Sequence, residues 1–178
     1  MHDDADPRVR AAALGALARL PDPPPGAWGR AVADPDSSVR RRAAEVAPAF
    51  AAAPREITAR LLILLTDPDV AVAEAAAWAL GECGPQVMEG GAVGRLAEAA
   101  KHHADPLVRE AAVAALGALG DQAGLEAVLA ACGDKPAIRR RAVLALAAFE
   151  GAEVEAALRA ALEDKDWQTR QAAEDLLG

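Results

Sequence analysis

Residues 105–117, which read DPLVREAAVAALG, decide the fold. Asp105 can accept hydrogen bonds from the first free backbone N–H groups of a helix, and Pro106 suits the first helical position. Val108 and the residues 3, 4, 7 and 8 positions after it are all apolar, which is the period of one helix face. The segment therefore predicts an α-helix that begins after Asp105 and buries one side.

The same pattern recurs six times in the 178 residues, so repetition is the main signal of the chain. Each copy has an anchor residue, usually followed by arginine, with an aspartate within five residues before it. The anchors are Val9, Val39, Val72, Val108, Ile138 and Thr169. Their spacings are 30, 33, 36, 30 and 31 residues. In the third copy Ala73 replaces the arginine.

Each copy predicts an anchor helix, and a second, less regular helical pattern lies between successive copies. The anchor helices are expected near residues 6–20, 36–50, 69–82, 106–119, 136–149 and 166–177. Pro48 should kink or end the second of these about a turn early. We expect one domain, residues 1–178, of five helical hairpins plus a leading half, or about 11 helices. A stack of such hairpins builds a continuous core that one hairpin cannot build alone.

The pattern Asp-Pro-x-x-x-Val-Arg-x-x-Ala-Ala-x-x-Leu-Gly resembles the short HEAT repeat of the phycobilisome-lyase (E-Z) type. The clearest copies are Asp67–Gly81 and Asp105–Gly117, and the resemblance covers essentially residues 4–178. It implies an all-α, armadillo-like α-solenoid, a right-handed α-α superhelix whose anchor helices line the concave side. It also implies a structural ladder between neighbouring repeats, formed by the turn aspartates and the arginines. We assign to it Asp6, Arg10, Asp34, Arg40, Asp67, Asp105, Arg109, Asp134, Arg139, Asp164 and Arg170. Where Ala73 stands, the ladder should be weaker.

The positions five and six after each anchor predict a mixed stripe for partner binding on the concave face. Its apolar middle would be Trp78, Val113, Val143 and Leu144, and its charged members Arg41, Arg140, Glu74 and Glu110. An exposed tryptophan at the centre of such a surface is typical of an interface anchor. The alternative, which stays open here, is that Trp78 folds over a small neighbour such as Ala114 and mainly covers the core.

Composition argues against several classes of function. The net charge is −8, which opposes nucleic acid or an anionic membrane as the main partner. The chain has no tyrosine or asparagine, so it has few parts for a polar catalytic site. We expect no cofactor and no metal, and His102 and His103 with Asp105 predict a solvated turn. Isolated Cys83 and Cys132, and an N-terminus without signal-peptide features, predict a reduced, cytoplasmic protein.

The leading hypothesis is a non-enzymatic scaffold that binds another protein or peptide on its concave surface. The first alternative, from the family resemblance, is a subunit of a bilin lyase or isomerase. A lesser one is a nucleic-acid-binding HEAT protein resembling the alkylpurine glycosylases. The first anchor helix lacks a preceding partner, so we expect a monomer or weak self-association through its apolar side. That side consists of Val9, Ala12, Ala16, Leu17 and Leu20.

Overall fold

Helices make up the fold throughout the described part of the chain. The computed structural model describes residues 4–50, 54–85 and 90–178, and in these ranges it has eleven α-helices and no strand. The prediction of an all-α fold is therefore confirmed. The chain divides into two compact units, unit 1 at Met1–Ala92 and unit 2 at Val93–Gly178. That residues 1–178 form a single domain stays a prediction.

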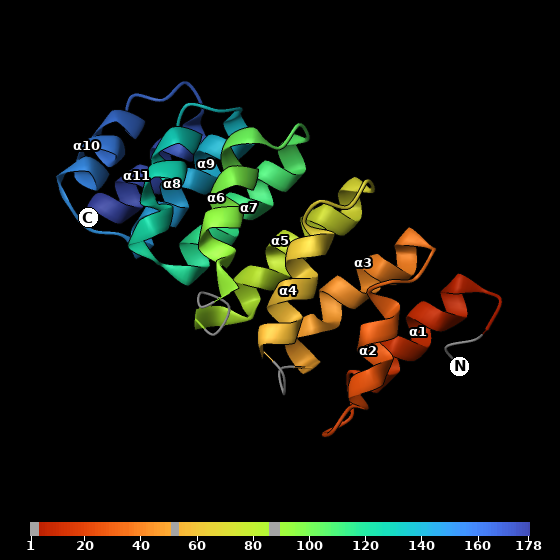
Figure 1. Cartoon of the computed structure of the whole chain (residues 1–178). Helices are drawn as coiled ribbons and strands as arrows, with labels where there is room; N and C mark the ends of the chain where they lie inside the picture. The colour runs from red at the N-terminus through yellow and green to blue at the C-terminus, as the bar shows by residue number, and fades with distance from the viewer. Residues whose placement is uncertain (1–3, 51–53, 86–89) are drawn as a thin grey trace. The chain divides into compact units, whose positions relative to one another are not determined.

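Unit 1 is a stack of helical hairpins. The anchor helix α3 packs between the anchor helices α1 and α5, while α2 contacts α1 and α3, and α4 contacts α3 and α5 (Figure 1). The helices are α1 (Pro7–Leu17), α2 (Pro25–Ala31), α3 (Ser37–Val46), α4 (Pro54–Leu64) and α5 (Val70–Glu82). The predicted effect of Pro48 is confirmed, since α3 ends at Val46 and a 3-10 segment, η1 (Ala47–Phe50), follows it.

Unit 2 repeats the arrangement. Here α9 packs between α7 and α11, α8 contacts α7 and α9, and α10 contacts α9 and α11 (Figure 1). The elements are α6 (Ala92–His102), α7 (Pro106–Leu119), η3 (Gln122–Gly124), α8 (Leu125–Ala131), α9 (Pro136–Ala145), η4 (Leu146–Ala148), α10 (Ala152–Ala161) and α11 (Trp167–Leu177). Each unit is therefore a two-layer stack in which anchor helices form one layer, as the α-solenoid class requires.

Aspartates start most of the anchor helices. Their side chains accept a hydrogen bond from a backbone N–H in the first turn, which satisfies one of the free donors at a helix start. The capping residues are Asp6, Asp36, Asp69, Asp105 and Asp166. The helix α9 is the exception, because Lys135 precedes it without a side-chain cap and Pro136 opens it.

The anchor residues form the centre of each stack. Five of the six are at most 1% exposed: Val39, Val72, Val108, Ile138 and Thr169. Val9 is 42% exposed, and Leu20 at the end of the same repeat is 48% exposed. Ala12 and Ala16 of the same side are exposed too and Leu17 is half-buried, while self-association through this side stays a prediction. None of the described helices has both the length and the apolar character needed to cross a bilayer.

Candidate partner-binding surface

Four arginine–aspartate pairs join successive repeats inside the two units. In each pair the arginine Nε and Nη2 atoms donate to the two carboxylate oxygens of an aspartate at the start of the next repeat, at 2.7–3.0 Å. The pairs are Arg10–Asp34, Arg40–Asp67, Arg109–Asp134 and Arg139–Asp164. Such two-point contacts fix both distance and orientation. The predicted ladder is confirmed for these eight residues.

The same arginines also tie down their own turns. In each, the Nη1 atom donates to one or two backbone carbonyls of the turn just before its helix, as Arg40 does to Asp34 and Pro35 at 3.0 Å. The hydrogen bonds from the arginines lower the pKa of Asp34, Asp67, Asp134 and Asp164 below the ordinary value of 3.8. The contacts that hold the repeats together therefore account for the lowered pKa values of these four carboxylates.

Three of the predicted ladder residues make other contacts than the arginine–aspartate pair. The assignment of Asp6 and Asp105 to the ladder is wrong, because both carboxylates cap their own helices, accepting from the N–H groups of Arg8 and Leu107. Among the described residues, Arg170 makes the backbone half of the contact, to the carbonyls of Asp164 and Lys165, without a carboxylate partner. The ladder aspartate stands four or five residues before the anchor, and the capping aspartate stands three residues before it.

Between the third and fourth copies, the sequence replaces both residues of the arginine–aspartate pair. Ala73 occupies the arginine position, and His103, five residues before Val108, occupies the aspartate position. The His103 Nδ1 accepts from the Asp105 N–H at 3.1 Å, as the Asp67 carboxylate does from the Asp69 N–H at 2.9 Å. His103 thus keeps the local turn contact of the aspartate without its charge.

Half of the predicted apolar stripe is exposed. Trp78 on α5 and Leu144 on α9 are each 46% exposed, and both stand six residues after an anchor. Val113 and Val143, five residues after an anchor, are 0% and 1% exposed. Their prediction as contact residues is wrong, because this position packs into the stack in both units: Leu14, Ala44 and Ala77 are buried too.

The predicted charged residues differ in their partners. Arg41 pairs with Glu45 at 2.9 Å within α3, and Glu110 on α7 lies 3.6 Å from Arg141 on α9. Arg140 donates to the side chain of Gln168 on α11. Within the described ranges, Glu74 makes neither an ion pair nor a side-chain hydrogen bond. Their proposed role in partner binding stays a prediction.

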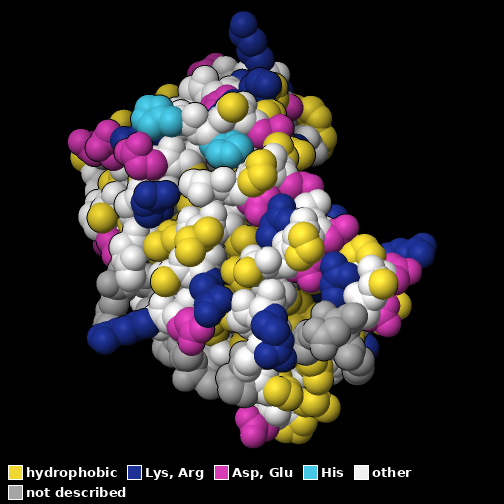
Figure 2. Space-filling model, turned by 45° about the vertical axis from the view of Figure 1, so that its right-hand side comes forward, with side chains coloured by type: hydrophobic (Ala, Val, Ile, Leu, Met, Phe, Trp, Pro, Cys, Tyr) yellow, Lys and Arg dark blue, Asp and Glu magenta, His cyan; other side chains and the backbone are white. Residues whose placement is uncertain are grey.

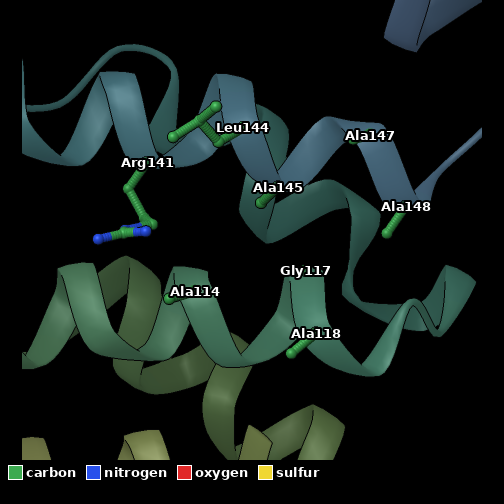
Figure 3. Close-up of a pocket in the computed structure, with 8 residues that line it drawn as sticks. All are labelled: Ala114, Gly117, Ala118, Arg141, Leu144, Ala145, Ala147 and Ala148. Atoms are coloured by element: carbon green, nitrogen blue, oxygen red, sulfur yellow. The ribbon is translucent and has the colours of Figure 1, made fainter. Parts of the chain in front are cut away.

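Unit 2 has a shallow groove of about 340 Å³ that the sequence did not predict. Small residues line it from α7, α9 and η4, Leu144 adds to the lining from α9, and the Arg141 side chain extends from α9 toward α7 (Figure 3). Its lining residues are Ala114, Gly117, Ala118, Arg141, Leu144, Ala145, Ala147 and Ala148. The sequence does contain a signal for this groove. The residues six, nine and ten positions after the anchors Val108 and Ile138 are all small except Leu144.

Acidic and basic side chains are interspersed on the displayed surface, with hydrophobic side chains between them (Figure 2). In the described ranges no group of three or more histidine, cysteine, aspartate or glutamate side chains could hold a metal ion. Burial raises the pKa of both thiols, Cys83 and Cys132, to about 11. The exposed groups are thus suited to contact another molecule through packing and charge.

Comparison with known proteins identifies the repeat. The model for HEAT repeats matches residues 57–137, and the model for the PBS lyase HEAT-like repeat matches residues 138–164. No curated protein gives a significant match.

Similar solved structures include a designed armadillo repeat protein in complex with peptide (KR)4. It is 16% identical, with a TM-score of 0.68, and the alignment covers 98% of this chain and 94% of that chain. The complex of CpcE and CpcF of phycocyanin lyase from Nostoc sp. PCC7120 is 21% identical, with a TM-score of 0.67 and coverage of 99% and 73%. An engineered protein is 20% identical, with a TM-score of 0.67 and coverage of 99% and 92%. At these identities the likeness is one of fold.

Proposed function

Because the chain is a HEAT-repeat protein, matched over residues 57–164, we propose that it is a non-enzymatic scaffold that binds another protein on its anchor helices. Stacked hairpins present a long row of side chains from successive anchor helices, and that row can follow an extended partner. The proposal places the protein in the cytoplasm, since Cys83 and Cys132 are free thiols. It takes a protein rather than a nucleic acid as partner because the net charge is −8.

One observation carries the proposal, the exposure of Trp78. This large apolar ring is 46% exposed on α5, whereas Trp28 is 3% exposed and donates from its Nε1 to the Ala43 carbonyl at 2.8 Å. Tryptophan is enriched among the residues that dominate binding energy at protein interfaces. Trp78 therefore supports a contact surface on the anchor-helix side of unit 1.

The chemistry of the titratable groups supports a role without catalysis. The ladder accounts for the lowered pKa values of Asp34, Asp67, Asp134 and Asp164. A thiol with a pKa of about 11 is almost wholly protonated at neutral pH and is a weak nucleophile. The peptide complex of a similarly folded armadillo repeat protein also supports a protein or peptide partner.

A subunit of a bilin lyase or isomerase is the second candidate. The match of residues 138–164 to the PBS lyase HEAT-like repeat and the likeness of fold to the CpcE–CpcF complex favour it. Mixing the purified protein with free bilin tests this role directly. A red shift or sharpening of the bilin absorbance band would favour the lyase-type role, and an unchanged spectrum would favour the scaffold.

The scaffold is tested by capture of partners from a lysate of the source organism. Wild type and Trp78→Glu are immobilised at equal density, with Trp167→Glu as the matched control because Trp167 is also exposed, at 64%. Trp78→Glu should lower the recovery of specific partners by about tenfold or more, while Trp167→Glu should leave it unchanged. Circular dichroism checks that both variants fold. Equal recovery on wild type and Trp78→Glu would contradict the proposed surface.

A further inference from the structure

We propose that Trp78, with Glu74 and Glu82, binds a lysine or arginine side chain, so that the partner presents a basic segment to α5. The inference rests on the proposed function and names the chemistry of its partner. It comes from the residues on either side of the exposed tryptophan. Glu74 stands four residues before Trp78 and Glu82 four residues after it, all within α5 (Val70–Glu82).

Helix geometry places the three side chains in one row. Residues four apart on an α-helix are neighbours on its surface, with Cβ atoms about 6 Å apart. Long side chains of a helix lean toward its N-terminus. The Glu82 carboxylate therefore leans toward the ring of Trp78, and the ring leans toward Glu74. The result is an aromatic surface with a carboxylate on each side along the helix axis.

Both carboxylates are available for a ligand. Over the described ranges, neither Glu74 nor Glu82 takes part in an ion pair or a side-chain hydrogen bond. Other glutamates do: Glu56 pairs with Arg60 at 2.9 Å, and Glu155 pairs with Arg159 at 2.8 Å. The charges beside Trp78 are therefore not neutralised by their own helix.

The nearest anchor helix in unit 1, α3, does not neutralise them either. Its residues Arg41 and Arg42 share the carboxylate of Glu45, at 2.9 and 3.0 Å. The guanidinium of Arg42 also lies over Gly15 of α1, which is the neighbour of α3 on the side away from α5. Both arginines are thus paired with Glu45, and neither is paired with Glu74.

A basic side chain satisfies all three groups at once. The face of an indole ring attracts a cation, and tryptophan is the best of the aromatic residues for this contact. Two carboxylates beside the ring add charge-assisted hydrogen bonds for an ammonium or guanidinium group. A glutamate or aspartate of a partner would instead be repelled. The net charge of −8 further favours the approach of a basic segment.

The test measures binding of three labelled octapeptides by fluorescence anisotropy at one fixed ionic strength. The peptides alternate glycine with lysine, glutamate or serine. The lysine peptide should bind and the other two should not. Trp78→Ala should weaken its binding about two- to fivefold, the ratio that a cation–π contact at an exposed site gives. Trp78→Phe should retain part of the affinity, which guards against a loss that comes only from misfolding.

Matched controls separate the site from general charge. Glu74→Gln with Glu82→Gln should weaken the lysine peptide by about threefold or more. Glu150→Gln with Glu153→Gln removes the same charge from exposed positions in unit 2 and should have a smaller effect. Trp167→Ala tests an exposed tryptophan that has Gln171, not a carboxylate, four residues later in its helix, and it should bind as wild type does.

Three results would overturn the inference. These are the absence of lysine-peptide binding to wild type, equal binding of the serine peptide, and equal losses in the two double variants. Each is distinct from failure of the scaffold itself. If Trp78→Glu still loses its captured partners while the lysine peptide shows no preference, the surface is real and its ligand is not basic. If Trp78→Glu captures partners as well as wild type does, the proposed function itself is contradicted.

Discussion

Arg139 and Asp164 are joined by two hydrogen bonds of 2.8 Å, although 25 residues of chain separate them. The arginine side chain is 19% exposed and the aspartate 16%, so the pair is largely shielded from water. A third bond, from Nη1 of Arg139 to the Asp134 carbonyl at 2.9 Å, holds the turn before α9. One side chain thus connects its own turn to the next repeat.

Removing that connection should cost more than removing the turn contact alone. We expect Arg139→Ala to lower the free energy of unfolding by about 2 kcal/mol, because Asp164 is left partly buried without its partner. Arg170→Ala is the matched control, since the hydrogen bonds of Arg170 to the described residues go to the carbonyls of its turn, and it should cost about 1 kcal/mol. Urea unfolding followed by circular dichroism measures both. Equal losses would mean that the carboxylate contact does not stabilise the stack.

Acid should weaken the stack through the same pairs. The hydrogen bond from the paired arginine lowers the pKa of Asp34, Asp67, Asp134 and Asp164 in the folded state. Their stabilising contribution is therefore full above the unfolded pKa of about 4 and is lost as pH falls through the lower folded values. The urea midpoint should fall steadily below about pH 5. Asp164→Asn should show a shallower fall, and a slope identical to wild type would exclude this cause.

The sequence predicted the helices well because their signals are local. The bounds of α7 are those expected, 106–119, since Asp105 and Pro106 mark its start. The interruption at Pro48 was predictable for the same reason, because the missing backbone donor acts within one turn. Predicting the ladder required telling the aspartate that pairs with an arginine from the aspartate that caps the helix. Their spacings from the anchor differ, but only the hydrogen bonds show that the two aspartates have different roles.

The contact surface was predicted less well because it depends on neighbours. A single helix viewed along its axis places Val113 and Val143 within the exposed stripe. In the stack, however, an anchor helix is covered on more than one side: α9 contacts α7, α8 and α11. The buried arc is therefore wider than one helix face, and it takes in the position five residues after the anchor. Trp78 and Leu144, one residue further on, remain outside it.

The two thiols should be inert in the folded protein. Burial raises the pKa of Cys83 and Cys132 to about 11, so at pH 8 only about one thiol in a thousand is ionised. Reaction with Ellman's reagent should be slow for the native protein and rapid for two thiols per chain in denaturant. Cys132→Ser tests the assignment, because the remaining thiol, Cys83, should react as slowly as before. Rapid labelling of the native protein would show that the site opens or that the pKa is lower.

The spacing between α7 and α9 depends on Gly117. A Cβ atom on Gly117 would lie 2.7 Å from the Cβ of Ala145 and 2.9 Å from its Cα, so α9 would have to move. We expect Gly117→Ala to lower the free energy of unfolding by about 1–3 kcal/mol, even though alanine favours a helix. Gly15→Ala is the control, because the nearest atoms to its new Cβ belong to the end of the Arg42 side chain, which can shift without moving a helix. That variant should be neutral or more stable by up to about 1 kcal/mol. Thermal unfolding of both decides the matter, and a stabilised Gly117→Ala would mean that the two anchor helices are not in contact there.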